Sequence, residues 1–224
     1  MVDDRSTGPT PASTRRHRAR RGDGQQLRQQ IIHATARLLA DTGDEEAVSI
    51  RSIADAVGVT PPSIYLHFAD KTELVFAVCD EHFRELDRRS EEAAAGARDP
   101  FDEIHLRGQA YVRFGLENPE QYRILFMGRH QPDDVSPEQV EQWASYQHMV
   151  DAVRRAMDAG MVEPGDPQLV TIGLWAAVHG ITSLMVAKPT FPWPPVDVVV
   201  GQVMAMCTFG VVRRDIDGRP AVAV

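Results

Sequence analysis

The chain has 224 residues, of which 43% are hydrophobic and 25% are charged, and its formal net charge is −8. This composition is typical of a soluble globular protein with room for one large or two small domains. It predicts neither a secretory leader nor an apolar run of about 20 residues that could span a bilayer. Cys79 and Cys207 are far apart, so we expect buried structural thiols and no cysteine-based metal site.

Charge is distributed unevenly along the chain. Residues 1–75 carry ten basic and ten acidic side chains, so the negative excess lies in residues 76–224. Within the first part, seven arginines stand close together with Asp23 as the one acidic residue among them, namely Arg15, Arg16, Arg18, Arg20, Arg21, Arg28 and Arg37. Such a cluster supplies the counterion-release component of DNA affinity, so an acidic protein can still bind DNA through this part.

The first 24 residues are rich in Pro, Ser, Thr, Gly and Arg and have no apolar periodicity, so they predict a disordered arm. Two interpretations of its arginines stay open: a solvated tail, or an arm that enters the minor groove of bound DNA. Residues 25–42 follow as the first predicted helix, which Gly43 closes. Its buried stripe is predicted to be Leu27, Ile31, Ala34, Leu38 and Leu39.

Two short helices joined by a tight turn are predicted over residues 49–68. Ser49 is a good N-cap for the first helix, and Gly58 can end that helix in the left-handed conformation. Thr60 is the expected N-cap of the second helix, with Pro61 at the first position, where a missing N–H costs nothing. Proteins place a helix in the DNA major groove in this way, although a helical hairpin buried in an ordinary α-domain would show the same pattern.

The residues that follow distinguish these alternatives. Asp70 with Glu73 three residues later is a capping-box pattern, and it opens a long amphipathic helix directly after the short second one. The segment from Leu27 to Ala77 closely resembles the DNA-binding region of the tetracycline-repressor (TetR) family of bacterial transcription regulators. The matching residues are Ile53-Ala54, Gly58-Val59, Tyr65, His67-Phe68, Lys71 and Leu74. The resemblance implies an all-α fold, with a three-helix helix-turn-helix domain over residues 25–70 and a larger helical ligand-binding and dimerisation domain over residues 71–212.

Eight residues are predicted to contact DNA. Four of them open the second helix of the motif and are expected to face base edges, namely Thr60, Pro61, Pro62 and Ser63. The other four are expected to hold phosphates and set the register, namely Arg51, Tyr65, His67 and Lys71. The two prolines depart from the Ser or Thr plus Lys or Gly that is common at this place in the family, so the resemblance transfers no operator sequence.

The rest of the chain is predicted to be helical, with no β-alternation long enough for a sheet. A capping residue followed by proline recurs at Asn118, Ser136 and Asp166 and marks three helix starts. A connecting helix and five further helices are predicted over residues 71–95, 101–117, 119–127, 137–159, 167–186 and 196–212. A frayed C-terminal tail is predicted over residues 213–224.

The last two predicted helices are too apolar for the surface of a monomer. The helix over residues 196–212 is apolar on nearly every side, so it must be covered within the chain or by a second copy. A two-fold dimer would also match the two half-sites of a palindromic operator in double-stranded DNA. In the TetR family the last two helices form a four-helix dimer interface, and the resemblance implies one here, with contacts from Trp175, His179, Val199, Val203, Met206 and Phe209.

A second, narrower resemblance concerns one subgroup of the family's C-terminal domains. The run from Trp175 to Gly180 resembles its Trp-His-Gly (WHG) signature, and the run from Asn118 to Phe126 fits the same subgroup. Trp175 and His179 are four residues apart and therefore share one helix face. For His179 we favour a core or interface histidine satisfied by a hydrogen bond over one that contacts a ligand.

A ligand pocket is expected between the helices of the second half, since such pockets are apolar with a few polar anchors. Its candidate lining consists of aromatic, methionine and amide side chains, namely Phe114, Phe126, Met127, Trp143, Tyr146, Gln147, Met149 and Trp175. Each of these residues taken singly is better explained by packing. Together they suit a flat or lipophilic molecule, and the family implies a small-molecule inducer whose binding changes the spacing of the two DNA-binding parts.

Signals of catalysis are weak in this sequence. It contains no glycine-rich phosphate loop, nucleophile elbow or zinc-spaced Cys and His pair, so neither an enzyme nor a cofactor is predicted. Four histidines are scattered over separate predicted helices, namely His82, His105, His130 and His148. We therefore predict a cytoplasmic, nucleoid-associated, homodimeric and ligand-responsive transcriptional regulator, acting as a repressor, although activation stays open. The alternative is a helical small-molecule-binding protein whose DNA-binding part is vestigial.

Overall fold

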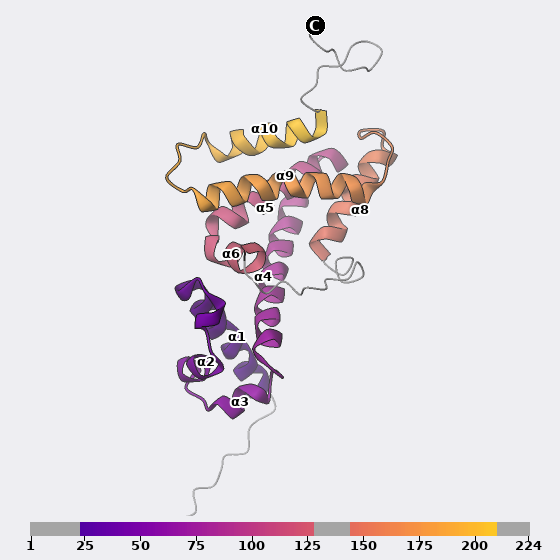
Figure 1. Cartoon of the computed structure of the whole chain (residues 1–224). Helices are drawn as coiled ribbons and strands as arrows, with labels where there is room; N and C mark the ends of the chain where they lie inside the picture. Colours follow the sequence, from indigo (N-terminus) through magenta and orange to yellow (C-terminus); the bar gives the residue numbers. More distant parts are fainter. Residues whose placement is uncertain (1–22, 128–143, 210–224) are drawn as a thin grey trace, which may run out of the picture.

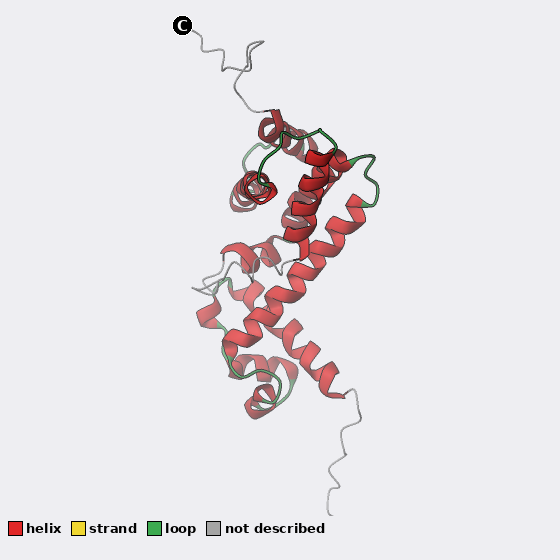
Figure 2. Cartoon of the chain, turned by 90° about the vertical axis from the view of Figure 1, so that its right-hand side faces the viewer, coloured by secondary structure: helices red, strands yellow, loops and turns green. Residues whose placement is uncertain are grey.

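The computed structural model describes residues 23–127 and 144–209, without the side chains of Asp23, Met127, Thr208 and Phe209. Over these ranges the chain is helical and has no strand, which confirms the predicted all-α fold (Figures 1 and 2). The helices are α1 (Asp23–Thr42), η1 (Glu45–Ala47, a single 3₁₀ turn), α2 (Ile50–Val57), α3 (Pro61–Tyr65), α4 (Lys71–Ala94), α5 (Pro100–Glu117), α6 (Pro119–Met127), α8 (Ala144–Asp158), α9 (Pro167–Ala187) and α10 (Val196–Phe209).

The helices form two groups that the long helix α4 connects (Figure 1). Helices α1, α2 and α3 lie together at one end, and α4 leads from them into the group formed by α5, α6, α8, α9 and α10. In the second group α5 packs against α4, α8 and α9, and α10 lies along α9 at the far end of the molecule. Since α1 also touches α6, the first group is joined to the second through both α4 and α6.

The turn between α2 and α3 forms as its residues predict. The Ser49 hydroxyl accepts from the Ser52 N–H at 3.1 Å, and the Ser52 hydroxyl accepts from the Ser49 N–H at 2.9 Å, so two serines make a reciprocal capping box. Gly58 ends α2 with φ of +79°, and its N–H donates to the carbonyl of Ala54 at 2.9 Å. These bonds fix the angle at which α3 leaves α2.

Thr60 stands at the N-cap position of α3, but its side chain makes no capping bond to the backbone that the structure describes, contrary to expectation. Pro61 and Pro62 occupy the first two helical positions and have no N–H to be capped. The next N–H, that of Ser63, donates to the Thr60 carbonyl at 2.8 Å. The Thr60 hydroxyl is left to pair with the Ser63 hydroxyl at 3.0 Å. The two prolines therefore remove the need for a side-chain cap.

The first group of helices has its own apolar core, to which α4 contributes its first turns. Asp70 caps α4 by accepting from the Glu73 N–H at 2.8 Å, and Glu73 in turn accepts from the N–H of Ala69. These two bonds confirm the capping pattern, except that Glu73 accepts from the N–H of Ala69 and not from that of the N-cap residue Asp70. The buried core residues are Ile31, Ile32, Leu39, Val48, Ile53, Ala54, Ile64, Phe68, Leu74, Val75 and Val78.

The second group agrees with most of the predicted helix limits. Asp166 caps α9 through the Gln168 N–H at 2.8 Å, as expected. Asn118 differs: its side-chain amide donates to the Phe114 carbonyl at 3.0 Å, so it completes α5 instead of capping α6. The arm was predicted to reach residue 24, but α1 already begins at Asp23, and residues 1–22 lie outside the described residues. The predicted cap at Ser136, the start of the helix predicted over 137–159 and the C-terminal tail also lie outside them.

Helix α9 is an exception to the expectation that the chain has no apolar run long enough to span a bilayer. It has 21 residues and a mean hydropathy of 1.7 over its most apolar window, which is long and apolar enough to cross a membrane by these two measures. One side of α9 is nevertheless buried in the core, through residues that include Leu174, Val178 and Met185. Since core helices of globular proteins pass the same test, we assign α9 to the core.

Candidate DNA-binding surface and ligand cavity

The residues predicted to contact DNA lie at one end of the molecule, and none of the eight is buried. Arg51, Thr60, Pro62 and Tyr65 are exposed, and Pro61, Ser63, His67 and Lys71 are half-buried. Leu66, which sequence reasoning passed over, is 83% exposed at the end of α3. An exposed apolar side chain beside the predicted base-contacting residues can contact a thymine methyl group. We therefore add Leu66 to the residues expected to contact DNA.

Lys71 has a structural partner that the sequence did not suggest. Its ammonium group donates to the carbonyl oxygen of Glu45 at 2.8 Å and so fastens η1 to the start of α4. Burial raises the pKa of the Glu45 carboxyl to about 7, and the charge of Lys71 opposes that rise. Lys71 thus holds the DNA-binding end together, and its predicted phosphate contact stays a prediction.

Polar side chains tie α1 to α4 on the outside of this group. His33 Nε2 lies 3.0 Å from a carboxylate oxygen of Glu81, and the Gln29 amide donates to the same oxygen at 3.2 Å. The Arg28 guanidinium lies 4.8 Å from the centre of the Phe68 ring. These contacts join α1 both to α4 and to the turn that follows α3.

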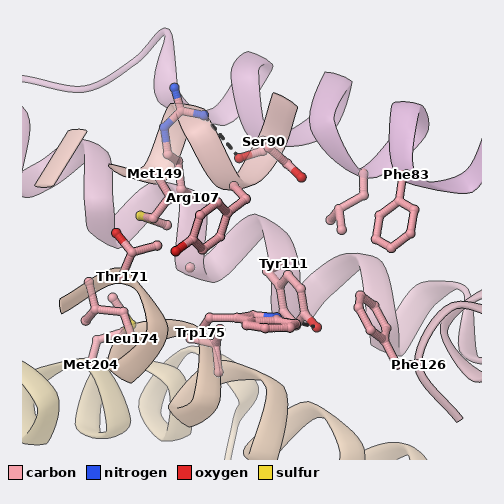
Figure 3. A pocket seen from close by; sticks show the side chains of 15 residues that line it. Phe83, Ser90, Arg107, Tyr111, Phe126, Met149, Thr171, Leu174, Trp175 and Met204 are labelled. Carbon is pink, nitrogen blue, oxygen red and sulfur yellow. Dashed lines mark hydrogen bonds between the residues drawn. The ribbon is translucent and has the colours of Figure 1, made fainter. Parts of the chain in front are cut away.

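A cavity of about 80 Å³ lies among α4, α5, α6, α8, α9 and α10 (Figure 3). Most residues of its wall are apolar, and a smaller number are polar. The lining residues are Phe83, Leu86, Ser90, Arg107, Gly108, Tyr111, Phe126, Ser145, Tyr146, Met149, Thr171, Leu174, Trp175, Val178 and Met204. This volume is below the roughly 300 Å³ of the smaller known ligand pockets, so a larger ligand requires the surrounding helices to move apart.

Four of the eight predicted pocket residues line this cavity, namely Phe126, Tyr146, Met149 and Trp175. Phe114 does not line it: this ring is 1% exposed and packs in the core, with the Arg89 guanidinium 5.6 Å from its centre. Tyr111, three residues earlier on α5, lines the cavity in its place. Gln147 is half-buried and not part of the wall, while the Met127 side chain and Trp143 lie outside the described residues.

Arg107 is the charged residue of the cavity wall, and it is 5% exposed. Its guanidinium donates to Glu103 at 2.9 and 2.8 Å, to Glu91 at 2.7 Å and to the Ser90 hydroxyl at 3.3 Å. Arg155 of α8 also donates to Glu103, at 2.7 Å. Because two carboxylates already pair with Arg107, its charge is neutralised within the protein.

His179 is held by hydroxyl groups of its own chain. Its Nδ1 atom lies 2.8 Å from the Tyr122 hydroxyl and 3.0 Å from the Tyr111 hydroxyl. Burial lowers the pKa of His179 and raises that of Tyr111, so these groups are neutral near pH 7. The Trp175 indole N–H donates to the Tyr111 hydroxyl at 3.4 Å. The imidazole therefore faces α5 and α6, and its predicted place at a dimer interface stays a prediction.

The opposite side of α9 and part of α10 form an exposed apolar face. Leu169 is 67% exposed, Leu184 and Met206 are also exposed, and a Cβ atom built on Gly173 or Gly180 would meet nothing within 4 Å. Val199 and Val203, which were predicted to lie at a dimer interface, are half-buried, and the Phe209 side chain is not described. Within the described residues nothing covers this face, which has the composition of a protein interface.

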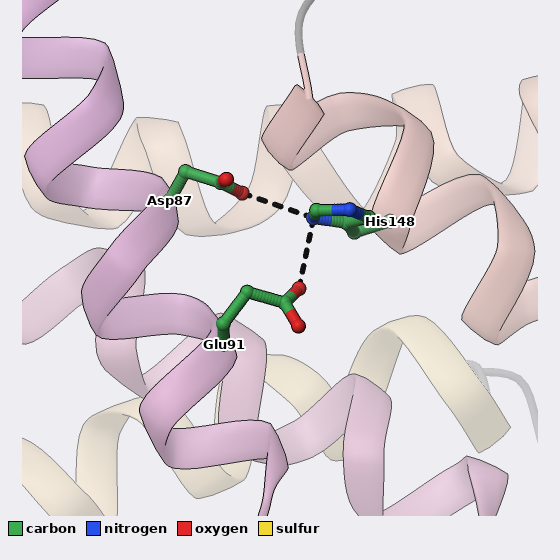
Figure 4. A group of neighbouring side chains, drawn as sticks. All are labelled: Asp87, Glu91 and His148. Carbon is green, nitrogen blue, oxygen red and sulfur yellow. Dashed lines mark hydrogen bonds and ion pairs between the residues drawn. The ribbon is translucent and has the colours of Figure 1, made fainter.

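Three side chains beside the cavity join α4 to α8 (Figure 4). His148 Nδ1 lies 2.8 Å from a Glu91 oxygen and 3.0 Å from an Asp87 oxygen. The three donor atoms lie within 4.8 Å of one another, a spacing that could suit a metal ion. Glu91 also accepts from the cationic Arg107, which disfavours a second cation there, so we interpret the group as a hydrogen-bonded cluster.

The arrangement of helices, with a short recognition helix at one end and a helical bundle at the other, defines a DNA-binding regulator. Two family descriptions match the sequence: "Bacterial regulatory proteins, tetR family" over residues 31–78 and "Tetracyclin repressor-like, C-terminal domain" over residues 104–206. The chain belongs to the TetR family, as its sequence predicted. Its assignment to the WHG subgroup stays a prediction.

Known proteins similar to the chain include transcription regulators. The HTH-type transcriptional activator FasR of Mycolicibacterium smegmatis is 27% identical over 151 residues, which are 66% of this chain and 67% of FasR. A structure of a protein of unknown function from Rhodococcus sp. RHA1 has a TM-score of 0.69 and 25% identity, covering 87% of this chain and 97% of that one. The regulator FadR of Bacillus subtilis, in complex with stearoyl-CoA, also has a TM-score of 0.69, with 15% identity over 82% of this chain and 98% of FadR, and shows the shared fold.

Proposed function

We propose that the chain is a homodimeric transcriptional repressor that binds a palindromic operator and releases it when a lipophilic molecule enters the cavity. One observation carries this proposal. Helix α4 buries Leu74, Val75 and Val78 in the core of the DNA-binding end, and some turns later it contributes Phe83, Leu86 and Ser90 to the cavity wall. A single helix thus belongs to both sites, so a ligand that moves α4 moves the DNA-binding end.

The size of the cavity supports a mechanical response. A ligand larger than about 80 Å³ must displace part of the wall, and α8 covers it with Tyr146 and Met149. Helix α8 is joined to α4 by His148 and, through Glu103, to α5 by Arg155. Displacement of α8 therefore pulls on α4. The ligand shifts the DNA-binding equilibrium only by its difference in affinity for the two states.

A long-chain acyl group is the class of ligand that we propose. The cavity wall is mostly apolar and includes Phe83, Leu86, Leu174 and Met204, which suit a hydrocarbon chain. FadR, whose fold is similar, is described in complex with stearoyl-CoA. An acyl chain is flexible and can enter a narrow cavity while the helices around it separate.

A second copy of the chain is the proposed cover for the apolar face of α9 and α10. The glycines Gly173 and Gly180 allow another helix to approach closely, and the exposed Leu169, Leu184 and Met206 supply apolar contacts. A two-fold dimer presents two copies of α3 to consecutive turns of the major groove. A regulator that acts on DNA in a bacterium works in the cytoplasm, which is where we place it.

Repression is proposed because a dimer that only occupies DNA needs no contact with RNA polymerase. FasR is named an activator, and the sign depends on where the operator lies relative to the promoter. A reporter gene with the operator overlapping its promoter tests the sign: loss of expression is expected when the protein is present, and a rise would establish activation.

The first experiment is selection of bound sequences from a random DNA duplex pool with the full chain. The expected result is a palindrome bound by an even number of chains, with affinity that falls steeply as salt rises. Stearoyl-CoA added to the complex should then release the DNA. Weak binding without sequence enrichment would contradict the proposal and favour a ligand-binding protein with a vestigial DNA-binding part.

A further inference from the structure

The described chain buries three threonines in helices, and their hydroxyl groups differ in one respect. The Thr35 hydroxyl donates to the Ile31 carbonyl at 2.8 Å, and the Thr182 hydroxyl donates to the Val178 carbonyl at 2.6 Å. Both hydroxyls donate to a carbonyl one turn earlier in their own helix, as a threonine inside a helix usually does. Thr171 of α9 is also buried, at 1% exposed, but its Oγ1 has no hydrogen-bond partner among the described residues.

Thr171 is also the one of the three that lines the cavity. Figure 3 shows its side chain directed from α9 toward Met149 of α8. A buried hydroxyl without a partner destabilises the fold, and an apolar residue of the same shape would avoid that cost. A hydroxyl that faces a cavity and is not bonded to its own helix is placed to pair with what enters the cavity.

The charges around the cavity limit what that partner can be. Arg107, the cation of the wall, already donates to Glu91, Glu103 and Ser90. A carboxylate entering the cavity would find this cation neutralised and two acidic side chains beside it, so burying its charge would be unfavourable. An uncharged oxygen avoids this cost, because Thr171 can donate to a carbonyl or accept from a hydroxyl.

We propose that the cavity recognises an apolar molecule through one uncharged oxygen, a hydroxyl or a carbonyl, that forms a hydrogen bond with Thr171 Oγ1. Met149, Leu174 and Met204 contact the hydrocarbon beside that oxygen. This inference rests on the proposed role of the cavity as a ligand site. It adds to that role the ligand group which is recognised and the residue that recognises it.

The test uses four probes of one chain length: decane, decanol, decanone and decanoate. Binding to the full chain is followed by the shift in melting temperature and by tryptophan fluorescence. Decanol or decanone should bind about tenfold more tightly than decane, the effect of one buried hydrogen bond, and decanoate should bind more weakly than either. Thr171→Val, which keeps the shape of the side chain, should bring the alcohol and the ketone to the level of decane, while Thr171→Ser should retain most of the preference.

Thr182→Val is the matched control, because it removes a buried hydroxyl that is bonded to its own helix. It should lower the melting temperature and leave the preference for oxygen unchanged, whereas Thr171→Val should not lower the melting temperature. The proposal is overturned if no probe binds, if decanoate binds most tightly, or if Thr171→Val keeps the preference. Release of operator DNA by stearoyl-CoA is measured separately, so failure of the proposed regulation is distinguishable from failure at Thr171.

Discussion

The two ends of the molecule differ in how completely each satisfies its own groups. At the DNA-binding end, the capping serines, Gly58 and the Thr35 hydroxyl all find partners within a few residues. The other end leaves Thr171 without a partner in the described chain and an apolar face of α9 and α10 uncovered. Under the proposed function, the first end holds a rigid surface against DNA, and the second end is completed by a ligand and a second chain.

The largest expected effect comes from breaking the apolar face of α9. Leu184→Arg places a charge on this face, so the dimer should dissociate, and operator affinity should fall on the order of 100-fold because each half-site is then bound alone. Analytical ultracentrifugation and operator titration measure the two effects. Met161→Arg alters an exposed apolar residue after α8, outside that face, and should change neither. A Leu184→Arg protein that remains dimeric would place the interface elsewhere.

A change at the other end should separate DNA binding from assembly. Tyr65→Ala removes an exposed ring from α3 and should lower operator affinity about tenfold, with the salt dependence unchanged because a neutral hydroxyl releases no counterion. The dimer and the melting temperature should stay as they are, because Tyr65 contributes little to the core. The same measurements on Leu66→Ala distinguish the two sides of α3: loss of sequence preference with little change in salt dependence would indicate a base contact.

The difference between the two ends also explains which features could be predicted from the sequence. The caps at Ser49, Asp70 and Asp166 and the turn at Gly58 depend on residues within four positions, so their pattern is visible in the sequence. The failure at Thr60 also has a local cause, the missing N–H groups of two prolines. The helical content and the family therefore followed directly from the sequence, and with them the place of the DNA-binding end.

The cavity could be predicted only in part because it depends on how distant helices rotate against one another. Phe114 and Tyr111 lie three residues apart on α5, and the orientation of that helix decides which of them lines the cavity. From the sequence alone, Arg107 is expected at the surface. It can be buried because the folded chain pairs it with Glu91 and Glu103. The partners of His148 lie on α4, more than fifty positions away, so no short motif could reveal the cluster.

The next prediction concerns the connection between the two ends. His148→Ala removes the side-chain contacts that join α8 to α4, so a ligand should still bind while its effect on DNA becomes smaller. Stearoyl-CoA should bind the variant within about twofold of wild type, and the change in operator affinity that it causes should shrink about fivefold. His105→Ala alters a histidine of α5 whose ring is tilted against that of Phe101; this variant is the control and should leave the response intact. An unchanged response in His148→Ala would show that the movement reaches α4 by another route.

The smallest effect is expected from Glu45, a half-buried acidic residue of η1 at the DNA-binding end. Burial raises the pKa of this carboxyl from 4.5 to about 7, so between these values the folded chain binds more protons than the unfolded chain. The stability of the folded state therefore falls as pH rises through this range. Glu45→Gln should remove that slope and stabilise the protein above pH 7 by about 1 kcal/mol, since solvent reaches part of the side chain and screens the charge.

Urea unfolding of Glu45→Gln across this pH range measures the effect, with Asp41→Asn, which removes an exposed carboxylate at the end of α1, as the control. The two variants should match below pH 4.5, where Glu45 is protonated in both the folded and the unfolded chain. Lys71 donates to the backbone carbonyl at position 45 and not to the carboxyl in the bond described above, so the glutamine variant keeps that fastening. The prediction is wrong if the stability of the wild type rises with pH over this range and the two variants do not differ. Water would then reach the Glu45 carboxylate freely, and burial of this carboxylate would not destabilise the DNA-binding end.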